Sequence, residues 1–131
     1  MDNVEIRRSP VSGKGLFTTK AHKKDDLVYT YTVEKVVRSD EIILLTAEQK
    51  DHLNQIGRDK YELIDAPGCY VNHSCDPNVM EKDRNGYALR NIAAGEELTV
   101  DYDRDAYLQE PFQCYCGAKN CRGQVQGRKH L

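Results

Sequence analysis

The chain has 131 residues, of which 39% are hydrophobic and 31% are charged, and its formal net charge is −2. This length suits one compact domain, and no apolar run approaches the roughly 20 residues that a membrane-spanning helix needs. The first ten residues also lack the apolar stretch of a signal peptide, so we expect an intracellular protein of a reducing compartment, cytoplasm or nucleus, with no membrane partner.

The charges are unevenly distributed along the chain. Residues 1–24 carry six Lys/Arg against two Asp/Glu, and the last 21 residues carry four against none. The stretch 25–110 holds nineteen acidic residues against nine basic ones. Direct nucleic-acid binding needs a basic face, so we do not expect it. An acidic middle suits a basic peptide, and an ordinary solvated surface explains the pattern equally well.

The first motif, Ser12 to Phe17, contains two glycines around one lysine, which allow a tight turn and a close approach of the backbone to a ligand. Taken alone, the segment is better explained as a simple turn. It is not the dinucleotide-binding fingerprint, because neither a third glycine nor a helix signal follows. Further on, the alternating stretch 27–33 predicts a half-buried strand with one face formed by Leu27, Tyr29, Tyr31 and Val33.

The middle of the chain predicts one short helix and several short strands. Thr46 and Gln49 form a capping-box pattern that opens a helix with apolar positions at Leu53 and Ile56. Short strands are expected at 61–64 and 69–71. The dipeptide Asn85-Gly86 is a hairpin signal between strands at 79–82 and 87–92, and Ala94-Gly95 precedes a strand at 98–102. These elements predict a mainly β domain with a few short helices.

Two polar motifs follow predicted strands. Residues 70–78, Tyr-Val-Asn-His-Ser-Cys-Asp-Pro-Asn, are dense in side chains that form hydrogen bonds, although a structural loop explains such a composition as well. Taken alone, His73 reads as a structural histidine. Residues 95–102 read Gly-Glu-Glu-Leu-Thr-Val-Asp-Tyr, and Tyr102 taken alone reads as a core or edge tyrosine.

The cysteines indicate a metal site. Cys114, Cys116 and Cys121 place three thiols within eight residues, and a disulfide between the first two is geometrically awkward. A closed structural zinc site takes four ligands. Cys75 is the natural fourth, whereas the competitor Cys69 falls within a predicted strand and reads as a small buried residue.

These four segments, in this order, resemble the SET-domain protein-lysine methyltransferases that carry a post-SET zinc motif, over Ser12 to Gly123. The resemblance implies a SET fold of small curved sheets with a knot-like C-terminal threading. It also implies a division into a SET domain at 1–108 with a short helical insert at about 38–58, a post-SET zinc motif at 109–125 and a basic tail at 126–131.

The resemblance further implies a cofactor, a substrate and residue roles. The cofactor is S-adenosylmethionine, and the substrate is a lysine in a protein such as a histone tail or another basic protein. Tyr102 matches the catalytic tyrosine, and Tyr31 matches a tyrosine that lines the target-lysine channel. The residues that match cofactor contacts are Ser12, Gly13, Lys14, Gly15, Leu16, Asn72, His73 and Tyr115. The residues that match zinc ligands are Cys75, Cys114, Cys116 and Cys121.

The chain departs from the family pattern in two places. Residues 30–34 lack the glutamate and glycine that surround the family's tyrosine, and Val100 stands where many relatives have Phe or Tyr. The number of methyl groups, the target lysine and the choice between monomer and homodimer stay open.

Two other functions are alternatives to the enzyme. One is an inactive SET-like module that binds peptide or cofactor, against which Asn72, His73 and Tyr102 argue. The other is a purely structural zinc protein, which gives the cofactor motifs no purpose.

Overall fold

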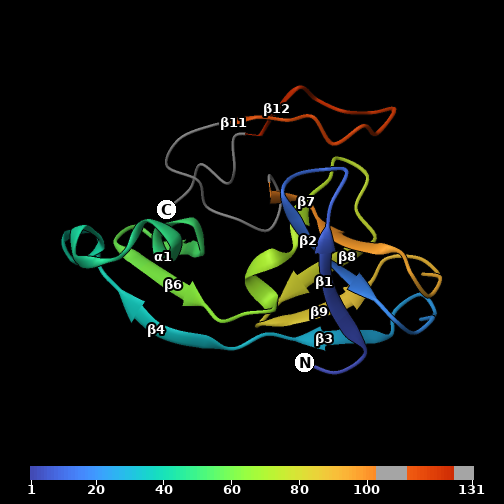
Figure 1. The fold of residues 1–131 in the computed structure, drawn as a ribbon, viewed down its shortest axis with the longest axis horizontal. Helices are drawn as coiled ribbons and strands as arrows, with labels where there is room; N and C mark the ends of the chain where they lie inside the picture. The colour runs from blue at the N-terminus through green and yellow to red at the C-terminus, as the bar shows by residue number, and fades with distance from the viewer. Residues whose placement is uncertain (103–111, 126–131) are drawn as a thin grey trace.

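Short strands make up most of the regular structure in the computed structural model, which describes residues 1–102 and 112–125. They form one sheet of four strands, two of three strands and one of two (Figure 1). This arrangement confirms the mainly β fold with few short helices. No helix of the described residues is both long and apolar enough to cross a membrane.

The central sheet brings the distant motifs together. It has the order β1 (Val4–Arg8), β2 (Lys14–Thr18), β10 (Glu97–Val100) and β7 (Asn72–His73). Strand β10 runs antiparallel to β2 and parallel to β7, with Asn72 opposite Thr99 and His73 opposite Val100. The glycine loop that leads into β2, the polar loop after β7 and the end of β10 therefore meet at one edge of this sheet.

A second sheet, β3 (Leu27–Thr30), β9 (Asn85–Ala88) and β8 (Val79–Lys82), contains the predicted hairpin, but the predicted turn is wrong. The turn residues are Asp83 and Arg84, whose φ angles of 53° and 65° fit a two-residue hairpin turn. Gly86 instead pairs with Tyr29, and a Cβ at Gly86 would lie 2.5 Å from the Tyr29 ring. The glycine is therefore required by packing under a tyrosine and not by the turn.

The insert forms a third sheet at one end of the molecule (Figure 1). Its order is β4 (Val33–Val37), β6 (Lys60–Ile64), β5 (Leu53–Gly57), with the 3₁₀ helix η1 (Ser39–Leu44) and helix α1 (Ala47–Asp51) between β4 and β5. The capping box is confirmed, because the side chains of Thr46 and Gln49 each accept the other's backbone N–H. The helical positions predicted for Leu53 and Ile56 are wrong, since both residues lie in β5.

The single strand predicted at 27–33 is also wrong in its extent and its face. It is divided into β3 and β4, and a register shift between Leu27 and Tyr29 places Val28 and Tyr29 both in the core. Leu27 is 55% exposed as a result. Simple alternation cannot anticipate such a bulge, because the extra residue changes which side chains face inward.

Residues 69–71 are not a strand, because Gly68–Tyr70 form the 3₁₀ helix η2. A Cβ at Gly68 would lie 2.6 Å from the Cβ of Tyr31, so this turn packs closely on the tyrosine.

At the C-terminus, β11 (Phe112–Gln113) pairs with β12 (Gln124–Val125). The predicted knot-like threading passes through residues 103–111, and the predicted basic tail is 126–131; both lie outside the described residues.

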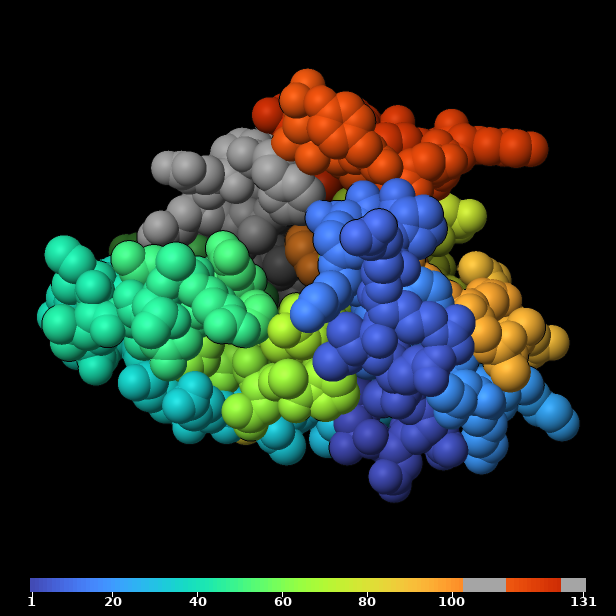
Figure 2. Space-filling model, in the orientation of Figure 1, coloured from blue at the N-terminus to red at the C-terminus, as the bar shows by residue number. Residues whose placement is uncertain are grey.

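The main core lies under the central sheet and the β3-β9-β8 sheet. Its most buried members include Leu16, Val79, Ile92, Leu98 and Val100, each at most 2% exposed. The C-terminal segment packs through a separate small cluster of Cys75, Cys114 and Val125. Figure 2 shows this segment seated against the N-terminal loop. The motif residues thus sit on a rigid core with the cysteine segment as a cover.

Candidate active site and metal cluster

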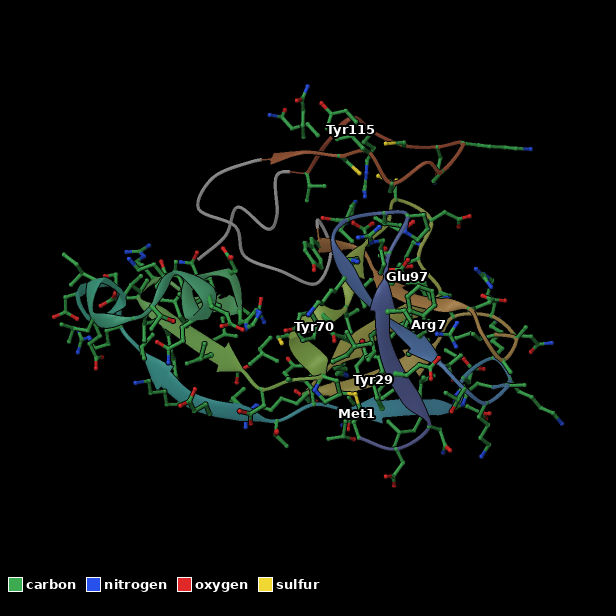
Figure 3. The ribbon with its side chains drawn as sticks, viewed as in Figure 1. Met1, Arg7, Tyr29, Tyr70, Glu97 and Tyr115 are labelled. Carbon is green, nitrogen blue, oxygen red and sulfur yellow. The ribbon has the colours of Figure 1, made fainter. Side chains whose placement is uncertain are left out.

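Asn72 ties the glycine loop to the central sheet. Its Nδ2 lies 3.1 Å from the carbonyl oxygen of Ser12, 3.0 Å from that of Lys14 and 2.9 Å from Oε2 of Glu97. The Ser9 hydroxyl lies 2.7 and 2.8 Å from the two Glu97 carboxylate oxygens. Figure 3 shows Glu97 beside β2. The Glu97 carboxylate therefore fixes the two ends of the loop through Ser9 and Asn72.

This carboxylate explains the second glycine of the loop. A Cβ on Gly15 would lie 2.3 Å from Oε2 of Glu97 and 3.0 Å from Cβ of Ser9. Gly13, with a φ of +46°, has no atom within 4 Å of its would-be Cβ, so its requirement is conformational. The two glycines therefore serve different purposes, one for the turn and one for the close approach of Glu97.

A first cavity of about 250 Å³ opens beside this loop. It is lined by the loop, by the motif after β7 and by the C-terminal segment: Val11, Ser12, Asn72, His73, Tyr102, Gln113, Cys114, Tyr115 and Cys116. Four of the eight predicted cofactor residues thus line one cavity. Among the described residues, Gly13, Lys14, Gly15 and Leu16 are not part of that lining, and Leu16 is fully buried in the core.

Tyr115 lies at the outer wall of this cavity on the C-terminal segment (Figure 3). Its side chain is 74% exposed, and its hydroxyl lies 2.7 Å from Oε1 of Gln113. An aromatic ring in this position offers a flat apolar face to a planar ligand group in the cavity.

His73 is buried and is engaged at both ring nitrogens. Its Nδ1 accepts the backbone N–H of Tyr102 at 3.0 Å, and its Nε2 lies 3.4 Å from Sγ of Cys75. In a neutral imidazole, an acceptor at Nδ1 places the proton on Nε2, where it points to the sulfur. Asp101 lies 3.8 Å from Nδ1 and also accepts from Arg122 at 2.7 Å.

Tyr102 lies at the end of β10, with its hydroxyl buried. The hydroxyl donates a hydrogen bond to the carbonyl oxygen of Val71. Burial, followed by the negative charge of Glu81, raises the pKa of Tyr102 well above its usual range. The phenol therefore stays protonated near neutral pH and acts as a hydrogen-bond donor, not as a base.

A second cavity, of about 120 Å³, also has Tyr102 in its lining. It is lined by the end of the insert, by η2 and by three strands: Asp51, His52, Leu53, Asn54, Ile64, Gly68, Cys69, Val71, Glu81, Val100 and Tyr102. Tyr102 thus lines both cavities. The predicted channel tyrosine Tyr31 is 7% exposed, packs in the main core and is not among the described residues of either lining.

Four cysteines meet under the C-terminal segment. The sulfur atoms of Cys75, Cys114, Cys116 and Cys121 all lie within 4.8 Å of one another, and those of Cys75 and Cys114 lie 3.8 Å apart. In a tetrahedral site with metal–sulfur bonds of about 2.3 Å, neighbouring sulfurs are separated by roughly 3.8 Å. None of the four forms a disulfide. The donor set therefore fits a tetrahedral thiolate metal site, and Cys69 is not part of it.

The polypeptide around the cluster supports thiolates. Burial opposes ionisation of Cys116, but backbone N–H donors, including that of Cys75, outweigh it and lower the pKa of Cys116 to about 6. Burial raises the pKa of Cys114 to about 12. The Arg122 N–H points at the Cys75 sulfur, 3.4 Å away.

The sequence family described as SET domain matches residues 13–103 of this chain, which hold the glycine loop, the polar motif and Tyr102. The chain belongs to the SET-domain family of protein-lysine methyltransferases. Cys75 lies within the matched region and the other three clustered cysteines follow it, and the cluster fits the post-SET motif of that family.

Curated relatives of this SET domain are named histone-lysine N-methyltransferases. The H3 lysine-36 specific enzymes of Chaetomium globosum and Aspergillus oryzae are 33% and 42% identical over 96% and 95% of this chain. The Drosophila melanogaster enzyme trr is 32% identical over 92% of it. The chain spans only 16%, 15% and 6% of the lengths of these three relatives.

Sequence reasoning missed three side chains that build the site: Ser9, Glu81 and Glu97. Glu96 and Glu97 are adjacent, and nothing local in the sequence indicates which of them faces the loop. The signal that the sequence offered for Glu97 was Gly15, because a glycine in a strand often marks a site where another group approaches the backbone closely. Glu81 gave no signal, because its partner Tyr29 lies 52 residues away in the chain.

Proposed function

We propose that this SET domain is an S-adenosylmethionine-dependent methyltransferase that acts on the ε-amine of a lysine in a protein. The observation that carries the proposal is that Tyr102 lines two cavities, one beside the glycine loop and one beside the insert. Transfer between two substrates needs their reacting atoms to meet in line. A cofactor in the first cavity and a lysine side chain in the second meet at Tyr102.

On the cofactor side, we assign the first cavity to S-adenosylmethionine, which supplies an electrophilic methyl group on a sulfonium when bound. The glycine loop from Ser12 to Leu16 supplies backbone groups, and its shape is held by Asn72. Asn72 and His73 line the cavity, and Tyr115 offers a ring to the adenine. These assignments rest on the lining residues together with the resemblance of the motifs.

On the lysine side, the target amine must lose its proton, since a free lysine has a pKa of about 10.4. A lysine side chain that fills this cavity displaces water from it, and desolvation favours the neutral amine. The carbonyl oxygen of Val71 and the hydroxyl of Tyr102 form a polar pair in its wall. We assign to this pair the orientation of the amine, and to Tyr31 the support of the channel through its contact with η2.

The cysteine cluster is proposed to hold one zinc ion through Cys75, Cys114, Cys116 and Cys121. With four protein ligands, such a site is closed and structural. Cys75 directly follows the motif of Asn72 and His73, and the other ligands belong to the segment that carries Tyr115. The site therefore couples metal binding to the closure of the cofactor cavity. We further propose the domain limits given above, with the zinc motif at 109–125.

Histone H3 is the proposed substrate. The fungal relatives are named as specific for H3 lysine 36, and a histone tail is a basic peptide. The acidic stretch 25–110 supplies the opposite charge. The chain spans only 16% and 15% of the lengths of those enzymes, so mass spectrometry of methylated H3 is needed to identify the target lysine.

The test combines cofactor binding with product mass. Calorimetry with S-adenosylhomocysteine should give one site per chain, and incubation of core histones with S-adenosylmethionine should add methyl-sized mass steps that map to lysine. Cofactor binding without any mass gain on histones or on a whole-proteome extract would favour the inactive binding module. Absence of cofactor binding by the zinc-loaded protein would leave only the structural zinc protein.

A further inference from the structure

Acidic residues belong to the lining of the cavity beside the insert. Two carboxylates line it, Asp51 and Glu81, and no Lys or Arg of the described residues does. Its other titratable lining groups are His52, Cys69 and Tyr102. A lysine side chain is an ammonium group on a flexible four-carbon stem, so a carboxylate in the cavity wall is a matched partner for it.

Glu81 is held in place by a buried tyrosine. The hydroxyl of Tyr29 donates to Oε2 of Glu81 at 2.7 Å, and Tyr29 is only 4% exposed. The carboxylate also acts on Tyr102, whose pKa is raised by burial first and by the charge of Glu81 second. Glu81 is therefore within electrostatic reach of the Tyr102 phenol, which lines both cavities.

Asp51 is the weaker candidate for the same role. It is the last residue of α1 and is exposed, so solvent screens its charge. Glu81 is half-buried on β8, in the sheet that packs against the main core. A fixed and partly desolvated carboxylate binds a cation more strongly than an exposed one.

We propose that Glu81 is the amine-binding residue of the lysine cavity, where its carboxylate receives the ammonium group of the target lysine and is itself positioned by Tyr29. This inference rests on the proposed function for the assignment of the cavity. It adds a fixed and partly buried carboxylate to a site that also offers Tyr102 and the carbonyl oxygen of Val71. It predicts a preference for a cationic over a neutral side chain of the same length.

The assignment has a consequence for pH dependence. A carboxylate beside the bound ammonium favours its charged form, so it raises the pKa of the bound lysine. Replacing the carboxylate by an amide should weaken substrate binding. It should also shift the rising limb of the kcat profile to lower pH, because the amine then loses its proton more easily. Loss of folding alone lowers the active fraction and does not move that limb.

A binding experiment tests the proposal without turnover. Protein with ¹³C-labelled glutamate carboxyls, saturated with S-adenosylhomocysteine, is titrated with n-butylammonium chloride and separately with n-butanol. The Glu81 resonance, assigned by its absence in Glu81→Gln, should move with the ammonium and not with the alcohol. No movement with the ammonium, or equal movement with both, would overturn the proposal.

Kinetics on core histones give the second readout. Glu81→Gln should raise KM by about tenfold or more and should move the rising limb of the kcat profile to lower pH. The matched control is Asp83→Asn at an exposed turn residue, which should leave KM and the kcat profile unchanged. An unchanged KM in Glu81→Gln, or a larger effect in Asp51→Asn, would contradict the role of Glu81. Should the wild type methylate nothing while n-butylammonium still moves Glu81, the methyltransferase proposal fails and the ammonium site stands.

Discussion

His73 accepts the backbone N–H of Tyr102 on one ring nitrogen, over 3.0 Å, and turns its other nitrogen toward the sulfur of Cys75, 3.4 Å away. One buried imidazole thus connects the proposed catalytic tyrosine with a proposed metal ligand. A histidine or other group that holds a ligand from outside the metal site strongly affects metal affinity. The position of Tyr102 is therefore expected to depend on the state of the cysteine cluster.

Replacing His73 by alanine should lower zinc affinity by roughly 10–100-fold, because the Cys75 sulfur loses the N–H donor of the imidazole. Competition with a zinc-binding dye measures this directly. The matched control is His52→Ala, a half-buried histidine that lines the other cavity, which should keep wild-type zinc affinity. Unchanged zinc affinity in His73→Ala would show that the ring does not support the ligand.

Removing a ligand should cost cofactor binding before it costs the fold. Cys121→Ser, or treatment with a strong chelator, should release zinc and weaken binding of S-adenosylhomocysteine, because Tyr115 and Cys116 line the cofactor cavity. The far-UV circular dichroism should change little, since the main core holds none of the four cysteines. Cys69→Ser is the control and should retain one zinc per chain. Full cofactor affinity in the zinc-free protein would contradict the coupling.

Gly15→Ala should weaken cofactor binding strongly. The new methyl group would lie 2.3 Å from Oε2 of Glu97, so the carboxylate must move and Asn72 loses its hydrogen bond to Glu97. We expect a loss of at least tenfold in affinity by calorimetry, which corresponds to about 1.4 kcal/mol. Gly57→Ala is the control, because its Cβ would meet only Lys60 at an ordinary 3.6 Å. Equal affinities in the two variants would refute the role of Glu97.

Two buried tyrosines make the fold sensitive to alkaline pH. Burial raises the pKa of both Tyr29 and Tyr102 above that of the unfolded chain. The folded state then holds more protons than the unfolded state above about pH 10, so stability is complete below that pH and falls as the pH rises. Thermal melts between neutral pH and pH 11 should show a shallower alkaline fall in Tyr29→Phe. The same slope in Tyr29→Phe as in the wild type would contradict this account.

The motifs could be predicted because their chemistry is local in the sequence. Three cysteines in eight residues and the run from Asn72 to Cys75 carry their spacing in the chain, and the structure brings the four cysteines together. The capping box of Thr46 and Gln49 is local in the same way, and it was confirmed.

Features set by tertiary packing could not be predicted. The bulge near Val28, the 3₁₀ turn at 68–70 and the displaced hairpin turn all depend on how Tyr29 and Tyr31 pack against Gly86 and Gly68. Glu97 and Glu81 belong to the same class, because their partners Asn72 and Tyr29 are 25 and 52 residues away. The spacing of apolar residues, with a period of two in strands and of 3.6 in helices, contains no information on such pairs.

The central claim is that Tyr102 serves methyl transfer between the two cavities that it lines. The most direct test is intact-mass spectrometry of core histones after incubation with S-adenosylmethionine, with wild type and Tyr102→Phe compared at equal zinc content and equal cofactor affinity. We predict methyl-sized mass gains on lysine for the wild type and a fall in rate of about 100-fold or more for Tyr102→Phe. Methylation by Tyr102→Phe at the wild-type rate would contradict the account.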